Sequence, residues 1–214
     1  EVTLSGSILD HEGNLMSDFN GVVSATMYDA EQSVTTNGNG DQGKVVTFEQ
    51  QGGKLYAGRD SVVNGQFSMH VAMPAEIAYN FRPAALNMYA VAHDGAEAVG
   101  CNRQFYVYGY DDNAAGDEEP PVIESLYLNH ESFKSGDAVN ESPMLIARIS
   151  DNKGINLSTA GIGHQMLVTL DGSDSYTDVS QYYTPDANGE PAGVIAYPIN
   201  NLVDGDHTLR LRVW

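Results

Sequence analysis

The residues 151–164, DNKGINLSTAGIGH, combine an aspartate, two hydroxyls and a histidine with several glycines and asparagines. This composition could serve a phosphate loop, a metal loop, a catalytic corner or a shaped connection between strands. A dinucleotide fingerprint needs G-x-G-x-x-G between a strand and a helix. Here Met166 stands where the third glycine should be, and a strand pattern follows instead of a helix. The stretch therefore does not predict a phosphate site.

Calcium is the second chemistry that these residue types could support. An EF-hand loop needs acidic or amide ligands at positions 1, 3 and 5, glycine at 6 and glutamate at 12. Counted from Asp151, position 3 is a lysine and the glycine arrives at position 4. Residues 111–117, DDNAAGD, fit positions 1, 3, 6 and 7, but Val122 stands at position 12. The calcium candidates are Asp111, Asp117 and Asp151, and no other metal or cofactor is predicted.

A structural role is the favoured interpretation of residues 151–164. Asp151 and Asn152 end a strand pattern, where short polar side chains accept hydrogen bonds from nearby backbone N–H groups. Gly154, Gly161 and Gly163 allow φ values that residues with a Cβ avoid. His164, at the start of the next strand pattern, is expected to orient the chain through a hydrogen bond.

Cys101 is the one cysteine of the chain, so no internal disulfide can form. Its alternating surroundings, AVGCNRQF, predict a small side chain packed among hydrophobic residues. Pairing with a distant histidine would make it a nucleophile, but nothing near it resembles an activating site. The sequence holds no HExxH and no G-x-S-x-G. No catalytic residue is predicted.

Tyrosines at alternate positions offer a different, non-enzymatic chemistry. Exposed rings in a row could stack on sugars, and the same spacing also suits packing between neighbouring strands. A carbohydrate-binding or adhesin-type surface module is therefore the alternative function. Its candidate residues are Tyr106, Tyr108, Tyr110, Tyr182 and Tyr183.

Charge excludes one large class of partner. The 214 residues carry 29 acidic and 10 basic side chains, a net charge of −19. Nucleic-acid binding needs clustered lysine and arginine, which the sequence lacks. No run of 18 apolar residues is present, so no membrane insertion is predicted. The acidic surface suits a soluble, exported protein.

Period-two alternation dominates the chain and helical periodicity is almost absent. The predicted fold class is all-β, with two consecutive Ig-like or FnIII-like β-sandwich domains. Asn64–Gly65 predicts a tight hairpin turn, because both residues tolerate the positive φ of a type I′ turn. Residues 33–44, rich in glycine and polar side chains, are expected to form a loop. The strand patterns lie near residues 1–9, 20–29, 44–50, 54–63, 66–74, 86–94, 98–109, 122–129, 142–150, 163–171, 193–199 and 207–214.

An acidic stretch with two prolines divides these patterns into two groups. We predict a first sandwich over residues 1–112, a linker over 113–121 and a second sandwich over 122–214. The first and last residues fall inside strand patterns. We therefore expect a piece of a longer polypeptide, with the second sandwich truncated at its C-terminal end.

Several blocks, in order, resemble one family over nearly the whole chain. The most specific are SVVNGQF to AYNF (residues 61–81) and GIN with GIGH (154–164), and the glycine expected after Phe81 is missing. They resemble the non-catalytic β-sandwich region of the type IX secretion sortases, gingipain-like cysteine peptidases of Bacteroidetes. In that family an upstream caspase-like domain supplies the catalytic cysteine and histidine. The resemblance gives Cys101 no catalytic role.

The resemblance implies a non-catalytic spacer and interaction region of a cell-surface cysteine peptidase, inactive by itself. The enzyme of that family removes a sorting domain from exported cargo and joins the cargo to a surface lipopolysaccharide. The expected partners are other domains of the same polypeptide, and secretion-system or cargo proteins. The expected location is extracellular, at the bacterial cell surface, in association with the outer membrane.

Overall fold

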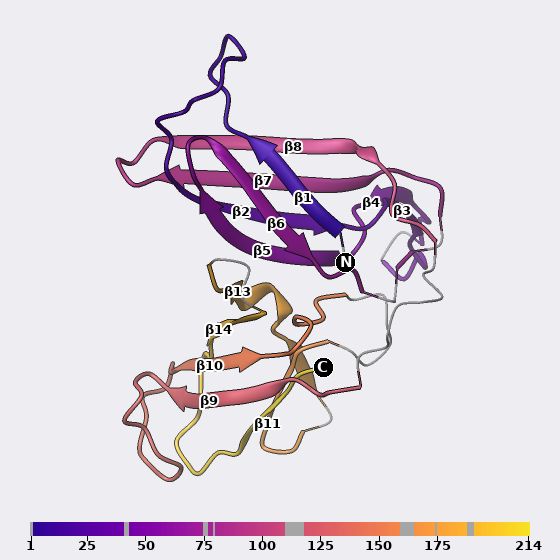
Figure 1. The fold of residues 1–214 in the computed structure, drawn as a ribbon. Helices are drawn as coiled ribbons and strands as arrows, with labels where there is room; N and C mark the ends of the chain where they lie inside the picture. The colour runs from indigo at the N-terminus through magenta and orange to yellow at the C-terminus, as the bar shows by residue number, and fades with distance from the viewer. Residues whose placement is uncertain are drawn as a thin grey trace.

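The computed structural model is built from antiparallel strands, which confirms the all-β prediction (Figure 1). Within the described part of the chain the helical structure is a single 3₁₀ turn, Ser180–Tyr182, and no α-helix is present. We call residues 2–109 the first half and residues 118–214 the second half. The structure describes residues 2–40, 43–74, 77–78, 80–109, 118–158, 165–173, 175–187 and 191–214.

The first half holds a four-stranded sheet, a two-stranded sheet and a small hairpin. The strand orders are β5-β2-β7-β8, β1-β6 and β3-β4. In Figure 1 the β1-β6 pair crosses in front of the four-stranded sheet, so the two form the layers of a sandwich. The strands are β1 (Val2–Ser7), β2 (Gly21–Tyr28), β3 (Gln32–Thr35), β4 (Thr47–Gln50), β5 (Lys54–Val62), β6 (Gln66–Val71), β7 (Ala84–Ala92) and β8 (Glu97–Phe105).

Alternation along β2 explains how this half folds. Its residues alternate between buried and half-buried along the whole strand, so one face lies in the core. Val23 on β2 is 1% exposed, and Met69 and Val71 on β6 are fully buried against the same cluster. The β5–β6 turn has φ values of 51° at Asn64 and 73° at Gly65, as its sequence predicts.

The second half repeats the sandwich plan with different pairings. Its sheets have the orders β13-β14-β10-β9 and β12-β11-β15. Leu145, Ile149 and Ile195 from the first of these sheets are fully buried, as is Met166 just before β11. The strands are β9 (Val122–Leu128), β10 (Met144–Ser150), β11 (Leu167–Leu170), β12 (Tyr176–Asp178), β13 (Tyr183–Pro185), β14 (Ala192–Pro198) and β15 (Leu209–Arg212).

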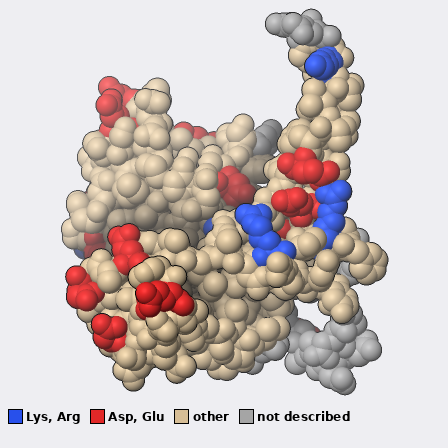
Figure 2. Space-filling view, turned by 90° about the horizontal axis from the view of Figure 1, so that it is seen from above, with Lys and Arg blue, Asp and Glu red and all other residues tan. Residues whose placement is uncertain are grey.

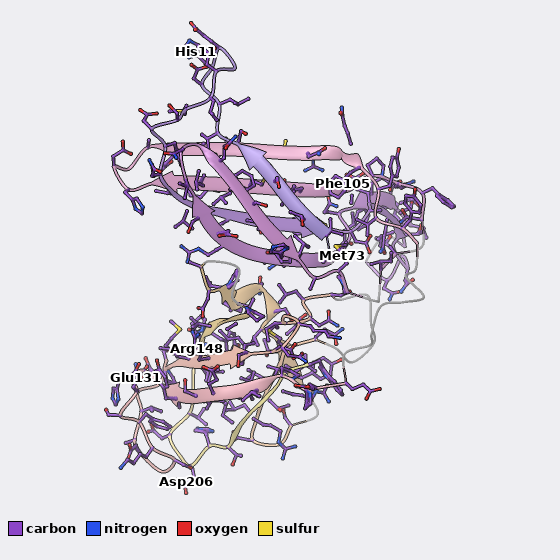
Figure 3. All side chains as sticks on the ribbon, in the orientation of Figure 1. His11, Met73, Phe105, Glu131, Arg148 and Asp206 are labelled. Atoms are coloured by element: carbon purple, nitrogen blue, oxygen red, sulfur yellow. The ribbon has the colours of Figure 1, made fainter. Side chains whose placement is uncertain are left out.

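The two halves are stacked end to end, with β13 of the second half against β5 of the first. The hairpin that carries His11 and the loop that carries Asp206 lie at opposite ends of the molecule (Figure 3). Each half has its own hydrophobic cluster, from residues 4–107 and mainly from 128–213. The structure thus has two separate hydrophobic clusters. The domain boundaries, with a linker over residues 113–121, stay a prediction.

Three short strands depart from the sequence-based expectations. The segment expected to be a loop begins with β3, whose residues pair with β4 from Gln32↔Gln50 to Thr35↔Thr47. Strands β12 and β13 have three residues each and were not expected. Such short strands give too few positions for a period of two to be recognised.

Candidate functional site

Among the calcium candidates, the structure describes Asp151, which shapes a turn. Its Oδ1 accepts hydrogen bonds from the N–H groups of Lys153 (2.8 Å) and Gly154 (3.1 Å). Gly154 has a φ of 106°, in the region that glycine tolerates. These contacts are those of the favoured structural interpretation of residues 151–154. Asp111, Asp117, Gly161, Gly163 and His164 lie outside the described residues.

No group of three or more histidine, cysteine, aspartate or glutamate side chains that could hold a metal occurs in the described ranges. The calcium prediction stays a prediction for Asp111, Asp117 and Asp151.

The prediction that Cys101 packs among hydrophobic residues is wrong, because its side chain is exposed. Cys101 lies on β8 opposite Asn87 of β7. Ala98, an odd number of residues away on the same strand, packs against the first core. Cys101 therefore points to the opposite, outer face, since successive side chains of a strand alternate.

The tyrosines of the carbohydrate hypothesis have different environments. Tyr106 and Tyr108 follow β8 and are 55% and 74% exposed, so they do not pack between strands. Tyr183 is buried in the second core, and Tyr182 packs edge-on against Tyr197 at a centroid distance of 5.0 Å. Tyr110 lies outside the described residues. Tyr106 and Tyr108 are thus the pair that could meet a sugar.

The contact between the halves is the candidate functional site, because it fixes how they are placed. Ala57 of β5 packs against the hydrophobic cluster of the second half. Tyr56 lies near Tyr183 of β13, and its hydroxyl donates a 3.4 Å hydrogen bond to the carbonyl of His70. Burial, with a smaller effect from Asp186, raises the pKa of Tyr183 well above its usual value. We call this contact the joint.

A charged pair borders the joint. Burial is the main influence on Lys54 of β5 and lowers its pKa, while the nearby Asp178 of the second half acts in the opposite direction. Arg148 of β10 reaches Asp186 with Nη2 at 2.5 Å and Glu124 with Nε at 2.8 Å, so it connects carboxylates beside β13 and on β9. The Arg148 contacts lie within the second half and hold the segment after β13 close to β10.

A cavity of about 490 Å³ extends the joint to the end of β2. Asp29 lines it from the first half and Ser158 from the second. Asp29 is 2% exposed, and its carboxylate accepts hydrogen bonds from the N–H groups of Ala30 and Ala78. Its own N–H donates to the carbonyl of Gly53. Asp29 therefore ties three backbone segments together at the wall of the cavity.

A second, smaller hollow of about 260 Å³ lies at the same end of the four-stranded sheet. Arg82 is held by Glu49 through both guanidinium nitrogens. Arg103 lies 3.9 Å from Glu31 and 3.3 Å from the Gln51 side chain, so its contacts are looser. On the face in Figure 2, most basic side chains gather at one end among acidic ones. Mutual pairing leaves little charge there for a ligand.

His207 forms a clasp at the far end of the second half. Its Nδ1 contacts Asp171 Oδ2 at 2.8 Å and its Nε2 contacts the Val203 carbonyl at 2.7 Å. Both acceptors are oxygens, so the ring donates both bonds only in its protonated, positively charged form. The Val203 carbonyl and Asp171 raise the pKa of His207, and bonds from Thr208 and His207 lower that of Asp171.

Sequence reasoning missed the joint, the Asp29 ties and the His207 clasp. Each of them joins residues far apart in the chain, such as Asp29 with Ala78 and Asp171 with His207. One local signal was available for Asp29, an acidic residue at the end of a strongly alternating strand. Nothing local indicates its partners.

The fold and the joint define the chain as an all-β protein of two stacked antiparallel sandwiches. No family model matches the sequence, and no curated protein matches it. The structure is similar to that of dimeric latent PorU from Porphyromonas gingivalis, with a TM-score of 0.51 and 30% sequence identity. The match covers 98% of this chain and 20% of the PorU chain. The chain thus has a PorU-like fold and spans about a fifth of that protein's length.

The described residues include no helix long and apolar enough to cross a membrane.

Proposed function

We propose that the chain is a non-catalytic spacer and interaction region of a cell-surface, gingipain-like cysteine peptidase of the type IX secretion system. The observation that carries the proposal is the PorU match, which takes in almost this whole chain and a fifth of PorU. In this proposal residues 1–112 and 122–214 are two sandwich domains joined by the acidic linker 113–121. Other domains of the same polypeptide, and secretion-system or cargo proteins, are the partners.

The stacked arrangement supports a positioning role. The joint places apolar and aromatic side chains of β5 and β13 together and adds the Lys54–Asp178 pair. In this proposal the apolar contact limits bending between the two halves, as hydrophobic interfaces between domains do when they are large. Segments attached at either end would then be held at a fixed distance and angle.

Catalytic inactivity is the first test. The chain is incubated with a cargo protein that carries its sorting domain, and products are followed by mass spectrometry. We expect no processing with or without a reducing agent, because Cys101 has no catalytic role in the proposal. Specific cleavage by the chain alone, lost on Cys101→Ser, would overturn it.

Stiffness is the second test. Spin labels on His11→Cys and Asp206→Cys, in a Cys101→Ser background, report the distance between opposite ends by pulsed electron resonance. We expect one narrow distribution, which Ala57→Arg broadens because a charged side chain then enters the joint. Val63→Arg is the matched control, since Val63 is 58% exposed near the end of the same strand. A broad distribution in the parent chain would contradict a spacer role.

A carbohydrate-binding module is the alternative, and the exposed Tyr106 and Tyr108 favour it. Aromatic rings free in solvent and spaced two residues apart can stack on sugar faces. A glycan array decides between the two functions. Saturable binding that Tyr106→Ala and Tyr108→Ala both abolish would favour the module, and an absence of binding would leave the spacer.

A further inference from the structure

Four Asn–Gly pairs lie in the described part of the chain, and the fold holds them to different degrees. In such a pair the glycine backbone nitrogen can attack the side-chain carbonyl carbon of the asparagine, because glycine has no Cβ to block the approach. The attack needs a glycine N–H and an asparagine side chain that are both free to move. Hydrogen bonds at either group therefore protect the pair. The pairs are Asn20–Gly21, Asn37–Gly38, Asn39–Gly40 and Asn64–Gly65, and a fifth, Asn188–Gly189, lies outside the described residues.

The pair Asn64–Gly65 is protected through its glycine nitrogen. The Gly65 N–H donates to the Phe19 carbonyl at 2.8 Å, so the attacking atom is already bonded. The Asn64 N–H donates to Asn20 Oδ1 at 3.0 Å. A Cβ at Gly65 would lie 2.3 Å from the Met16 carbonyl oxygen, so the turn is packed closely against another backbone segment. The turn therefore cannot rearrange without breaking these contacts.

The pair Asn20–Gly21 is protected through its asparagine side chain. Asn20 Nδ2 donates to the Asp18 carbonyl at 3.0 Å, and Asn20 Oδ1 accepts the bond from the Asn64 N–H. Gly21 begins β2 and is paired with β5 on one side and with β7 on the other. Neither reacting group is free to approach the other.

The other two pairs follow β3 in the loop that leads toward β4. The last backbone bond before them joins the Thr36 N–H to the Val46 carbonyl at 2.9 Å. Both asparagines are exposed. In Asn37–Gly38 and Asn39–Gly40, neither the asparagine side chain nor the glycine N–H makes a hydrogen bond within the described part of the chain. Both reacting groups are thus free in each pair.

The pair Asn39–Gly40 is the more open of these two. A Cβ at Gly40 would meet no atom beyond its chain neighbours within 4 Å, whereas one at Gly38 would lie 3.0 Å from the Gly43 carbonyl oxygen. The Gly40 carbonyl accepts a 2.9 Å bond from the Gly43 N–H, which leaves the Gly40 nitrogen unused. We therefore expect Asn39 to react before Asn37.

We propose that Asn39 is a site of spontaneous deamidation, with Asn37 as a slower second site. The Gly40 nitrogen loses its proton to hydroxide and bonds to Asn39 Cγ. The Cγ–Nδ2 bond breaks, and the departing amide takes a proton from water and leaves as ammonia. Water then opens the cyclic imide at either of its carbonyls, which gives aspartate or isoaspartate. Each event adds one negative charge, and the site does not depend on the proposed function.

Peptide mapping by mass spectrometry over time tests the proposal. The folded chain is kept in warm, mildly alkaline buffer, and fragment spectra locate the change from amide to acid. Peptides with Asn39 should convert into two separable products, aspartate and isoaspartate. Asn20 and Asn64 should react at least about tenfold more slowly, since a hydrogen bond must break first. Equal rates at Asn39 and at these two residues, or no reaction at Asn39, would overturn the proposal.

Gly40→Ala tests which nitrogen attacks. The added Cβ obstructs the approach to Asn39 but enters open space, so the fold should be kept. The rate at Asn39 should fall several-fold, while Asn37 keeps the rate that it has in the parent chain and serves as the internal control. An unchanged rate at Asn39 would exclude attack by the Gly40 nitrogen.

Unfolding the chain in denaturant tests whether the fold causes the difference. The hydrogen bonds at Asn20 and at Asn64–Gly65 are lost there, so all four pairs should react at similar rates. If Asn20 and Asn64 stayed slow in the unfolded chain, neighbouring residues rather than these bonds would protect them. That result would refute the structural basis of the proposal.

Discussion

The two edge strands of the four-stranded sheet differ in solvent exposure. β5 at one edge is buried or half-buried along its whole length, and β13 of the second half lies against it. β8 at the other edge is exposed at seven of its nine positions. The strands belong to one sheet and have the same length, so the difference comes from what covers them. The covered edge joins the halves, and the open edge pairs with no second strand of the described residues.

Side-chain type matches this division. β5 contributes Leu55, Tyr56 and Ala57 to contacts with the two hydrophobic clusters, and Gly58 leaves room for the Tyr56 ring. A Cβ at Gly58 would lie 1.8 Å from the Tyr56 hydroxyl. β8 instead places Val99 in solvent. Substitutions at the two edges should therefore have very different costs.

Tyr183→Ala should have the largest effect, because it empties a buried aromatic site where β13 meets β5. We expect a loss of about 3–5 kcal/mol in the free energy of unfolding. Amides of the second core and of β5 should exchange faster, as hydrogen exchange with mass spectrometry can show. Val99→Ala at the open edge is the control and should change stability by less than about 0.5 kcal/mol. Equal costs at both edges would refute the comparison.

Asp29→Ala should come second. It removes a carboxylate that accepts two backbone hydrogen bonds in a buried setting, which should cost about 1–3 kcal/mol. Asp94 is the matched residue near the open edge, where its carboxylate accepts a 3.0 Å bond from Ala96 in an exposed turn. Asp94→Ala should cost about 0.5–1.5 kcal/mol at most. Urea unfolding of the two variants gives the comparison, and a smaller loss for Asp29→Ala would contradict it.

The sequence predicts what depends on neighbours in the chain. Alternation placed the long strands, and the Asn64–Gly65 turn and the Asp151 turn follow from local steric and hydrogen-bonding rules. Cys101 shows the limit of such reasoning. Alternation places Cys101 and Ala98 on opposite faces of β8, but it does not show which face packs against the core and which is exposed.

The joint could not be predicted for the same reason. Tyr56 and Tyr183 are separated by more than a hundred residues, and each lies in a pattern that suits an ordinary buried strand position. A single sequence contains no signal that pairs them. The sequence also did not predict the short strand β13, so its contact with β5 could not be predicted.

Lys54→Met should slightly raise the free energy of unfolding, whereas Tyr183→Ala and Asp29→Ala should lower it. Burial lowers the Lys54 pKa, so the folded state disfavours the charged form, and the part-exposed side chain limits this penalty. We expect a gain of less than about 1 kcal/mol at neutral pH. In the parent chain, stability from this group rises as pH increases through the lowered folded pKa toward 10.5, and the variant lacks that rise. Thermal melts at neutral and alkaline pH measure the gain in stability and its pH dependence. A variant less stable than the parent chain would mean that the attraction between Lys54 and Asp178 outweighs the cost of burying the charge.

His207→Gln changes how stability depends on pH more than stability itself. The Val203 carbonyl and Asp171 raise the folded pKa of His207, with a smaller contribution from Asp206. A raised pKa stabilises the fold fully below the unfolded value near 6.5 and loses that contribution as pH rises through the folded value. The melting temperature of the parent chain should therefore fall as pH is raised from about 6 to 9, with faster exchange in β15.

His207→Gln should remove that fall, because glutamine keeps hydrogen-bonding capacity but cannot titrate. The control is His11→Gln, since the His11 side chain is 90% exposed at the opposite end of the molecule. It should keep the pH dependence of the parent chain. If both variants keep it, the clasp between Asp171 and residues 203–208 does not hold the edge strand β15. On its free side the edge strand β15 would then have no contact that stabilises it, as β8 has none among the described residues. The difference between a covered and an open sheet edge would then hold only for the first half.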